Sequence, residues 1–594
     1  MQLIAKTVKG HKYWYLVEKG RKNGVVTNVR TVYLGPANRL ADRLVSQGAT
    51  QFPVAFDSFE MGASAALFQE ASQLELESLL DQACGQRRQD AALSYGQLLT
   101  VLAIQRAIAP RPRKSLRKTE AFYQKSGLCE LLPVPLQGFD ERRIDEALEK
   151  LRAEDLAKAE ELIVQKMVAV HQLNLESLCF DATNFDSYAQ AQNPSRLLRR
   201  GHAKSKRMDL RLLGLGLLVT ADFGVPLLSF AYPGNVSDTV SFGSFLRRLV
   251  ARKKALPIGA TTTVVCDGGN ISQQRVEQLE QQHLCHVVRL PFGHAKEVDA
   301  LRTEQLPEIS GDFEDEVRAK KLETLVYGKT RTVVAVYSAA MHKSQLPGLS
   351  RDLGKAISEL EQLAERLVTQ AQGKHRGKPL TVEKTRWRVE KILSRQHLSD
   401  LFSIEVTGAG TDVKLVYRFL PQAYEDLAQH RLGRTVILTD HKDWEEAQIV
   451  SALREQSHVE EDFRQLKDPE WASCVPLRHQ KDPMLRVHTF ISVLALLLSK
   501  LLVRRLHQGG VKTTVNEALW QLSELRLARL VYGKDASPEL KALAETQRVP
   551  PVPNELQTQM IGVLGLRRAL RLGPTRRTSR KPSTPTVPAS PRTP

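Results

Sequence analysis

The spacing of hydrophobic residues changes several times along the chain, and each change predicts a different kind of structure. Two β-rich runs near the N-terminus, Tyr13–Val17 and Val25–Leu34, are separated by a turn-forming segment, which predicts a small β-meander within residues 1–58. Residues 59–172 lack such runs and place leucines at helical intervals, which predicts a helical region.

From about residue 173 the pattern changes to strands. Ser177–Phe180 is followed by Leu210–Thr220 and Val225–Tyr232, and a short turn joins the last two runs. This order predicts three antiparallel strands. Thr262–Cys266 is a continuous apolar run, typical of a strand buried on both faces. Three antiparallel strands followed by helix-separated strands indicate a ribonuclease-H-like α/β core, a mixed sheet flanked by helices, whose first part covers residues 173–295.

The next stretch interrupts this core. Residues 296–431 combine charged patches with a strand candidate at Arg331–Tyr337 and a helix candidate at Asp352–Gln370, so we expect an α+β insertion there. The apolar run Arg434–Thr439 resumes the strand pattern. The second part of the core is therefore expected over residues 432–512.

The end of the chain has two further parts. Residues 513–573 show helical spacing, which predicts a C-terminal helical region. Residues 574–594 are rich in Arg, Pro, Ser and Thr, a composition that predicts a disordered basic tail.

The chain is also long and strongly basic. Its 594 residues predict several domains with at least one large core. Its formal net charge is +19, which favours an acidic polymer, most plausibly nucleic acid, as partner. A basic surface without a dedicated partner is the alternative.

Cysteine usage and apolar segments argue against several classes of protein. No two of the six cysteines form a Cys-x2-Cys pair, so neither a zinc knuckle nor a disulfide framework is indicated. Cys179 and Cys266 lie in apolar runs and are expected to be buried. The N-terminus lacks the apolar segment of a secretory signal, and Phe490–Val503 is too short to span a membrane. These features predict a protein of a reducing cytoplasm with no membrane partner.

Two acidic residues lie at strand positions that suit phosphodiester chemistry. Asp181 is inside the first predicted strand, and Asp267 ends the buried run just before Gly268 and Gly269. Open α/β sheets place their sites at the carboxyl ends of parallel strands, although Asp267 followed by glycine is also explained as a simple turn. Carboxylate oxygens suit Mg²⁺ or Mn²⁺, and two such ions can stabilise both the attacking and the leaving oxygen of phosphodiester transfer.

A third acid lies in a segment with helical spacing. Apolar residues recur at i, i+4 and i+7 and should face the core: Val459, Phe463 and Leu466. The adjoining face carries one acid and two cations at the same spacing: Glu460, Arg464 and Lys467. The acid could bind a metal ion and the cations could bind phosphate, whereas an exposed ion pair of small energetic value is the alternative. Glu461 lies further round the helix, towards solvent.

The order and spacing of these features resemble the cut-and-paste DDE transposases of bacterial insertion sequences. In that family the third acid lies in a Tyr-x2-Arg-x3-Glu-x6-Lys helix. Glu460 and Lys467 match this spacing, but Leu453 and Gln456 stand at the tyrosine and arginine positions. Further matches lie in order along the chain at Tyr13–Val17 with Leu34-Gly35, Gly201–Lys204 with Arg207 and Asp209, Pro233–Asp238, and Val487–Leu496. The resemblance covers most of residues 10–530.

The resemblance implies a site and a reaction. By it, Asp181, Asp267 and Glu460 are the catalytic triad and hold two Mg²⁺ ions, with Mn²⁺ as an alternative, and residues 296–431 match the insertion that many such enzymes carry. It implies a DNA transposase that cleaves the ends of an insertion sequence by hydrolysis and joins the 3′-hydroxyl ends to target DNA by transesterification. A ribonuclease-H-like nuclease without strand transfer and a catalytically decayed DNA-binding relative are the alternatives.

The resemblance also implies partners and contacts. Double-stranded DNA, as inverted-repeat ends and as target, would be bound by a homodimer in the bacterial, nucleoid-associated cytoplasm, with end binding in residues 59–172. Lys467 and Arg464 would contact DNA. So would three residues after the first acid, for which a solvated loop is the alternative: His202, Lys204 and Arg207. Trp387 lies between two arginines and could stack on a base; a packed core tryptophan is the alternative.

Overall fold

The computed structural model forms two compact units. One contains described residues of 1–77, 87–145 and 501–594, and the other contains those of 78–86 and 146–500. The structure describes residues 2–573 apart from residues 9–10, 23–24, 37–52, 86–90, 111–113, 191, 204–206, 208, 254–255, 257, 259–260, 375–376, 411 and 535.

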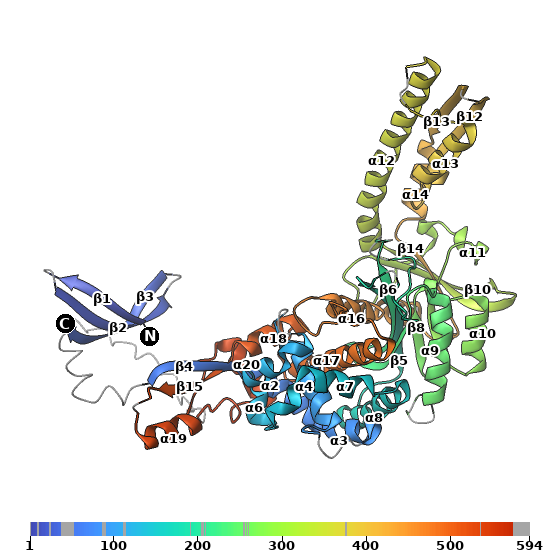
Figure 1. Ribbon diagram of the computed structural model, residues 1–594. Helices are drawn as coiled ribbons and strands as arrows, with labels where there is room; N and C mark the ends of the chain where they lie inside the picture. Colours follow the sequence, from blue (N-terminus) through green and yellow to red (C-terminus); the bar gives the residue numbers. More distant parts are fainter. Residues whose placement is uncertain are drawn as a thin grey trace, which may run out of the picture. The chain divides into compact units, whose positions relative to one another are not determined.

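An eight-stranded mixed sheet is the centre of the second unit (Figure 1). Its order is β10-β11-β14-β9-β8-β5-β6-β7, in which β5 pairs in parallel with β8, β8 pairs in parallel with β9, and the other pairs are antiparallel. The bounds of the strands are β5 Ser177–Ser187, β6 Arg211–Thr220, β7 Pro226–Pro233, β8 Thr263–Cys266, β9 Cys285–Leu290, β10 Val317–Val326, β11 Lys329–Ser338 and β14 Arg434–Thr439. An antiparallel meander beside parallel, helix-separated strands is the ribonuclease-H-like core that the sequence predicts.

Helices pack on both faces of this sheet. On one face, α9 (Asp238–Arg252) packs on β5, and the centres of the Phe245 and Phe180 rings are 4.0 Å apart. On the other face, α15 (Glu446–Arg454), α16 (Ser457–Lys467) and α17 (Asp482–Gln508) contribute to one buried cluster with the odd-numbered residues of β5. Side chains of a strand alternate between faces, so odd-numbered β5 residues point to α16 and even-numbered ones to α9.

The predicted insertion is smaller than residues 296–431. Strands β10 and β11 fall inside that range but extend the main sheet, because the apolar run Val333–Val336 pairs with β14 and is buried. The part with its own apolar core, including Leu360, Val389 and Val413, follows β11. It consists of α12 (Ala339–Ala371), α13 (Val382–Leu393), the hairpin β12–β13 (Phe402–Ala409 and Asp412–Phe419) and α14 (Pro421–His430). We call this part the insertion subdomain (Figure 1).

The first unit departs from the sequence prediction at two places. The N-terminal meander is present, and β1 (Gln2–Val8) adds a strand to β2 (His11–Lys22) and β3 (Val25–Pro36). The prediction that residues 513–573 are helical is wrong at β15 (Arg526–Tyr532), which pairs with β4 (Pro53–Glu60) and β16 (Arg548–Val549). The partner strand β4 lies far away in sequence, so no local pattern reveals the pairing.

The remaining described helices agree with the predicted helical regions. Between residues 59 and 172 they are α2 Gly62–Gln73, α3 Leu76–Cys84, α4 Tyr95–Ile108, α5 Thr119–Gln124, α6 Leu128–Leu131, α7 Glu141–Glu149 and α8 Ala153–His171. In the core, α10 (Gln273–Gln281) separates β8 from β9. After α17 come α18 Val515–Ser523, α19 Pro538–Thr546 and α20 Glu555–Leu564.

Helix α17 contains the apolar run Phe490–Val503. Among the described residues it is the one helix that is long and apolar enough to cross a membrane, and 94% of its most apolar window is buried within the structure. Such burial is typical of a core helix, as the sequence predicts. Cys179 and Cys266 are also buried, in agreement with their apolar surroundings.

Candidate active site

Parallel pairing brings Asp181 and Asp267 next to each other. The last register pair between β5 and β8 is Phe180 with Cys266, and each acid is the next residue of its strand. Asp267 keeps an extended backbone, with φ −78° and ψ 158°, so it continues the direction of β8. Burial, together with the charges of Asp267 and Asp181, raises the pKa of the Cys266 thiol well above its ordinary value. The carboxylates of Asp181 and Asp267 are therefore both close to Cys266.

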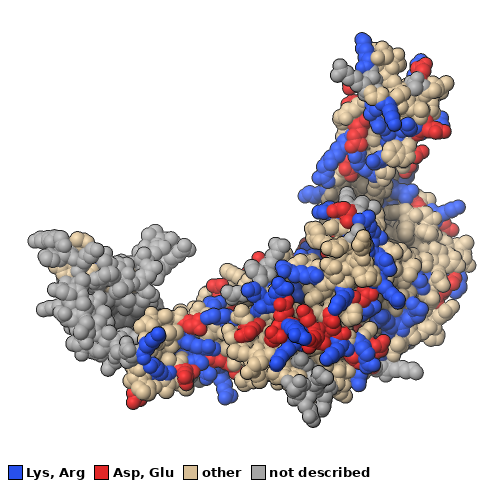
Figure 2. Space-filling view, viewed as in Figure 1, with Lys and Arg blue, Asp and Glu red and all other residues tan. Residues whose placement is uncertain are grey.

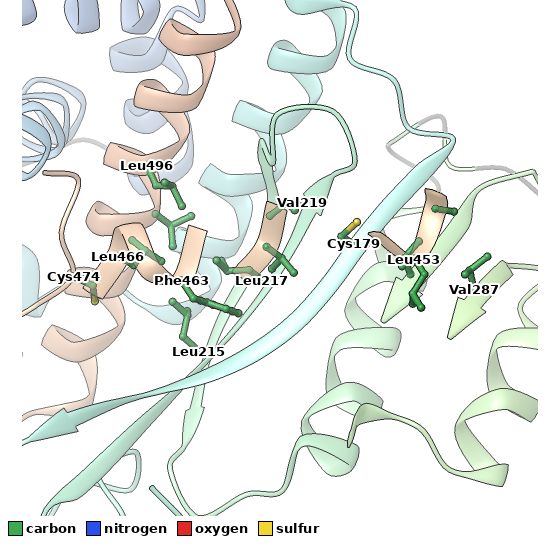
Figure 3. Packing of buried hydrophobic residues seen from close by; sticks show 14 of the residues in the cluster. Cys179, Leu215, Leu217, Val219, Val287, Leu453, Phe463, Leu466, Cys474 and Leu496 are labelled. Atoms are coloured by element: carbon green, nitrogen blue, oxygen red, sulfur yellow. The ribbon is translucent and has the colours of Figure 1, made fainter. Parts of the chain in front are cut away.

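Alternation along the strands sets which face the two acids occupy. Cys179 and Val265 belong to the buried cluster beneath α16, and each acid lies two residues further along the same strand. Leu217, which is directly opposite Asp181 in β6, belongs to the same cluster. Figure 3 shows Leu217 and Leu215 beside Phe463 and Leu466. Both acids are consequently on the α16 face of the sheet.

Helix α16 lies along β5 in a defined direction. Before its first residue, Glu455 accepts a hydrogen bond from Ser177 Oγ at 2.8 Å. At its last residue, Lys467 Nζ donates to Thr183 Oγ1 at 2.7 Å. Asp181 lies between these two contacts along the strand. The predicted apolar stripe is confirmed, since Val459, Phe463 and Leu466 are all buried.

Glu460 occupies the flank of α16 that also carries Lys467. Seven residues separate the two, which is about two helical turns, so their side chains lie on one side. That side contacts β5, as the bond from Lys467 to Thr183 shows. The opposite flank carries Asp462, which lies against Gly224 in the β6–β7 turn. Glu460 is exposed on the flank of α16 that faces the β5–β8 side, but in this structure Asp181, Asp267 and Glu460 do not form a group whose ligand atoms all lie within 4.8 Å of one another.

A buried ion pair holds α16 on its other flank. Asp462 is completely buried, and its Oδ1 is 2.7 Å from Nζ of Lys500 in α17, whose side chain is 6% exposed. Burial raises the pKa of the Asp462 carboxyl to about 7, against the opposing effect of the Lys500 ammonium. Nothing in our sequence prediction pointed to this pair. The available signals are the position of Asp462 three residues after Val459 and the lone lysine inside the apolar run of α17.

Two further residues contact the acids and were also missed. Asn270 is buried and its Nδ2 lies 3.5 Å from Asp181 Oδ1, while its own Oδ1 is buried without a hydrogen-bond partner among the described residues. Arg289 on β9 places NH1 3.3 Å from Asp267 Oδ1. The signal for Arg289 was its polar position at the end of an apolar strand that runs parallel to β8.

The donor set fits a hard divalent cation. Asp181, Asp267 and Glu460 would supply carboxylate oxygens, and Asn270 would add an amide oxygen that has no hydrogen-bond partner among the described residues and belongs to a side chain close to Asp181. Mg²⁺ and Mn²⁺ prefer such oxygen ligands. Arg289 supplies positive charge next to Asp267. Carboxylates on one sheet face under a helix thus give an arrangement that could bind metal ions and phosphate together.

The family pattern fails at residues that this fold buries. Leu453 is the next-to-last residue of α15 and belongs to the core cluster, and Gln456 is buried between α15 and α16. Helix α15 ends at Arg454, and α16 begins at Ser457. Leu453 and Gln456, which stand at the tyrosine and arginine positions, are therefore not part of the helix that carries Glu460.

The other predicted contacts differ in how accessible they are. Arg464 is exposed on α16, and His202 is exposed in the loop after β5. Arg207 is exposed, but it forms two hydrogen bonds with Asp209, at 2.8 and 2.6 Å, and lowers the pKa of that carboxyl to about 2. Lys204 lies outside the described residues. Arg207 would thus have to leave Asp209 to bind another anion.

Trp387 is a surface residue, so the alternative of a packed core tryptophan is wrong. Its relative exposure is 60%. Helix α13 buries Thr385, Val389 and Leu393 on its other side, and this spacing turns Trp387 outward. Lys391 Nζ lies 5.3 Å from the centre of the Trp387 ring.

Comparison with known proteins identifies the family of the chain. A family model described as "Transposase DDE domain" matches residues 176–498, more than half of the chain, and this range includes Asp181, Asp267 and Glu460. The comparison with curated proteins finds no match. Among solved structures, the chain is similar to one titled "Cryo-EM structure of piggyBac transposase synaptic complex with hairpin DNA", with 10% identity, 87% of this chain and 79% of that chain covered, and a TM-score of 0.31.

The ion pair between α16 and α17 yields a stability prediction. Replacing Asp462 by Ala leaves the Lys500 ammonium buried without its partner, so we expect the free energy of unfolding to fall by about 3–5 kcal/mol. Urea denaturation followed by circular dichroism measures the change. The matched control is Glu461→Ala, an exposed neighbour whose replacement should change stability by less than about 0.5 kcal/mol. Equal stability of the two variants would rule out a structural role for the pair.

Proposed function

The chain belongs to the family described as the transposase DDE domain, and from this premise we propose that it is a DNA transposase. It would bind the ends of an insertion sequence, hydrolyse the strands there, and join the freed 3′-hydroxyl ends to target DNA. Two features support the proposal: Asp181 and Asp267 follow paired positions on one face of the sheet, and α16, which carries Glu460, packs on that same face.

The three acids would hold two Mg²⁺ ions, with Mn²⁺ as an alternative. Bound ions would lower the pKa of water and neutralise charge on the attacking and leaving oxygens. Asp181 and Asp267 would hold the ions from adjacent strands, and Glu460 would supply a ligand from α16. Asn270 would restrain the carboxylate of Asp181. Arg289 would balance the negative charge of Asp267. Two such ions sit about 3.5–4 Å apart in enzymes of this chemistry.

The cations beside Glu460 would position the DNA strand. Lys467 is already directed over β5 by its bond to Thr183, which lies two residues beyond Asp181 on the same face. Arg464 lies one turn after Glu460 and is exposed. Both can neutralise phosphate oxygens close to the acids. The proposed reaction has two stages at one site. Water first attacks the phosphodiester at the element's end and breaks its P–O3′ bond, which leaves a 3′-hydroxyl on the element and a 5′-phosphate on the flanking strand. That 3′-hydroxyl then attacks a target phosphodiester, forms a new phosphodiester bond, and displaces the 3′-hydroxyl of the target strand.

The insertion subdomain offers a surface for DNA. Figure 2 shows Lys and Arg distributed over it among Asp and Glu. On α13, Lys384, Arg386 and Lys391 are exposed around Trp387. Aromatic stacking combined with phosphate contacts suits an unpaired or flipped base near the cleaved end. His202, Lys204 and Arg207 are proposed as further DNA contacts.

The triad predicts a metal-dependent reaction. Replacing Asp181 or Asp267 by Asn, or Glu460 by Gln, removes a charged ligand, so end cleavage with Mg²⁺ or Mn²⁺ should fall about a thousandfold, equivalent to several kcal/mol of transition-state stabilisation. Gel assays of cleavage measure the rate. DNA binding should persist because phosphate contacts supply most of the affinity. Glu461→Gln is the matched control and should cleave normally; full cleavage by the Asp181 variant would sink the assignment.

Strand transfer distinguishes a transposase from a nuclease that has the same core. With a precut end carrying a 3′-hydroxyl and with target DNA, we expect joined product, because the precut end bypasses the hydrolytic step. A protein that cleaves intact ends but never forms joined product is a nuclease. A protein that binds DNA and does neither is a decayed relative. The molar mass of the complex with DNA ends, measured by light scattering, should correspond to two protomers bound to two ends.

The exposure of Trp387 predicts a stacking contribution. Trp387→Ala should weaken binding of an end substrate with an unpaired base by about 1–3 kcal/mol, whereas Trp387→Phe should retain most of the affinity. Fluorescence anisotropy measures the dissociation constants. Trp520→Ala is the matched control, since Trp520 is 49% exposed in another part of the chain. Identical affinities for the two alanine variants would contradict a role for Trp387.

A further inference from the structure

A second group of metal-ligating side chains lies at the opposite ends of the strands from the proposed triad. Strand β9 begins at Cys285, and β14 ends at Thr439, which pairs with Val287. Continuing this antiparallel register places Asp440 across from His286 and His441 across from Cys285. Asp181 lies inside β5 and Asp267 follows the carboxyl end of β8, whereas Thr263, which contacts His441, begins β8. The length of β8 therefore separates the two groups.

Three of these side chains converge. One ligand atom each from Cys285, Asp440 and His441 lies within 4.8 Å of the other two. His441 Nε2 is 2.8 Å from Thr263 Oγ1, and its ring stacks on Trp444 with 3.6 Å between the ring centres. When Nε2–H donates to Thr263, Nδ1 keeps the lone pair that binds a metal ion. The imidazole is therefore fixed by two neighbours before any ion arrives.

The buried imidazole beside Asp440 is a second observation. His286 is 1% exposed, and both of its ring nitrogens lack a hydrogen-bond partner among the described residues. Its Nδ1 lies 3.5 Å from Asp440 Oδ1, and its backbone N–H donates to the same oxygen at 2.8 Å. Buried polar groups without partners are rare in folded proteins. If the carboxylate of Asp440 turned slightly to bind a cation, it could accept a hydrogen bond from Nδ1–H of His286.

A cavity gives an ion and water access to this cluster. Its volume is about 780 Å³, and its lining includes Cys285, His441, Trp444, Glu455 and His458. Three protein ligands next to an open cavity leave a fourth position for water, which is the usual arrangement when protein supplies only three ligands to a tetrahedral ion.

We propose that Cys285, Asp440 and His441 form a binding site for a Zn²⁺-class transition metal ion. A thiolate, an imidazole and a carboxylate are the donor types that Zn²⁺ takes, whereas Mg²⁺ does not take thiolate. On binding, the Cys285 thiol releases its proton to solvent, Asp440 and His441 donate lone pairs, and water fills the fourth position. The site ties the start of β9 to the segment 440–445 that leads into α15.

Co²⁺ is a suitable probe because its bonds to thiolate absorb light. The full chain is treated with a chelator and titrated with Co²⁺. We expect a thiolate-to-cobalt charge-transfer band that saturates at one ion per chain and disappears when Zn²⁺ is added. Cys285→Ser should abolish the band. Cys84→Ser, at another partly buried cysteine, should retain it, and so should Asp181→Asn with Asp267→Asn, because the triad takes no part.

Thermal unfolding provides a second readout. Zn²⁺ should raise the melting temperature of the unaltered chain and of Cys84→Ser, but not that of Cys285→Ser or His441→Gln, whose Zn²⁺ affinity should fall by at least about tenfold. Circular dichroism without metal shows whether each variant folds. A wild-type chain without a charge-transfer band overturns the proposal, and so does Zn²⁺ stabilisation that both ligand variants retain. Neither result depends on DNA cleavage, so the proposed function would stand or fall separately.

Discussion

The arrangement of the site depends on the packing of α16 against β5 and β6. The helix is short, and its polar flank can face the acids only if Val459, Phe463 and Leu466 remain in the core. The pair of Asp462 and Lys500 excludes a rotated helix, because rotation would leave a charge buried without its partner. Apolar burial thus supplies most of the stability, while the ion pair selects which flank of the helix turns towards β5.

Parallel pairing makes the second contribution. Asp181 and Asp267 are far apart in sequence, yet the register of β5 with β8 places them side by side on one face. Two carboxylates this close repel each other, and the surrounding structure compensates with Arg289 next to Asp267 and Lys467 over Thr183. The same cations would meet phosphate, so charges that stabilise the fold without metal also favour an anionic substrate.

The elements that carry the three acids could be predicted from the sequence, but the residues that contact the acids could not. Alternation and helical spacing predicted the strand of Asp181, the strand end at Asp267 and the outward flank of Glu460, since these depend on local periodicity. Asn270 and Lys500 could not be predicted, because their partners come from other elements. The pairing of β4 with β15 was missed for the same reason. Trp387 was ambiguous until the burial of Val389 showed which side of α13 faces outward.

The two ends of the parallel strands therefore differ in chemistry. Within β5 and just after β8, carboxylates and an amide offer hard oxygen ligands. At the start of β9, Cys285 faces His441, a combination of thiol and imidazole that hard cations avoid. Because the length of β8 separates the two sets, each could bind its own class of ion without competing for the other. The direction of the strands places Asp267 after β8 and Cys285 at the start of β9. The proposed Zn²⁺-class ion would therefore bind at a distance from the acids.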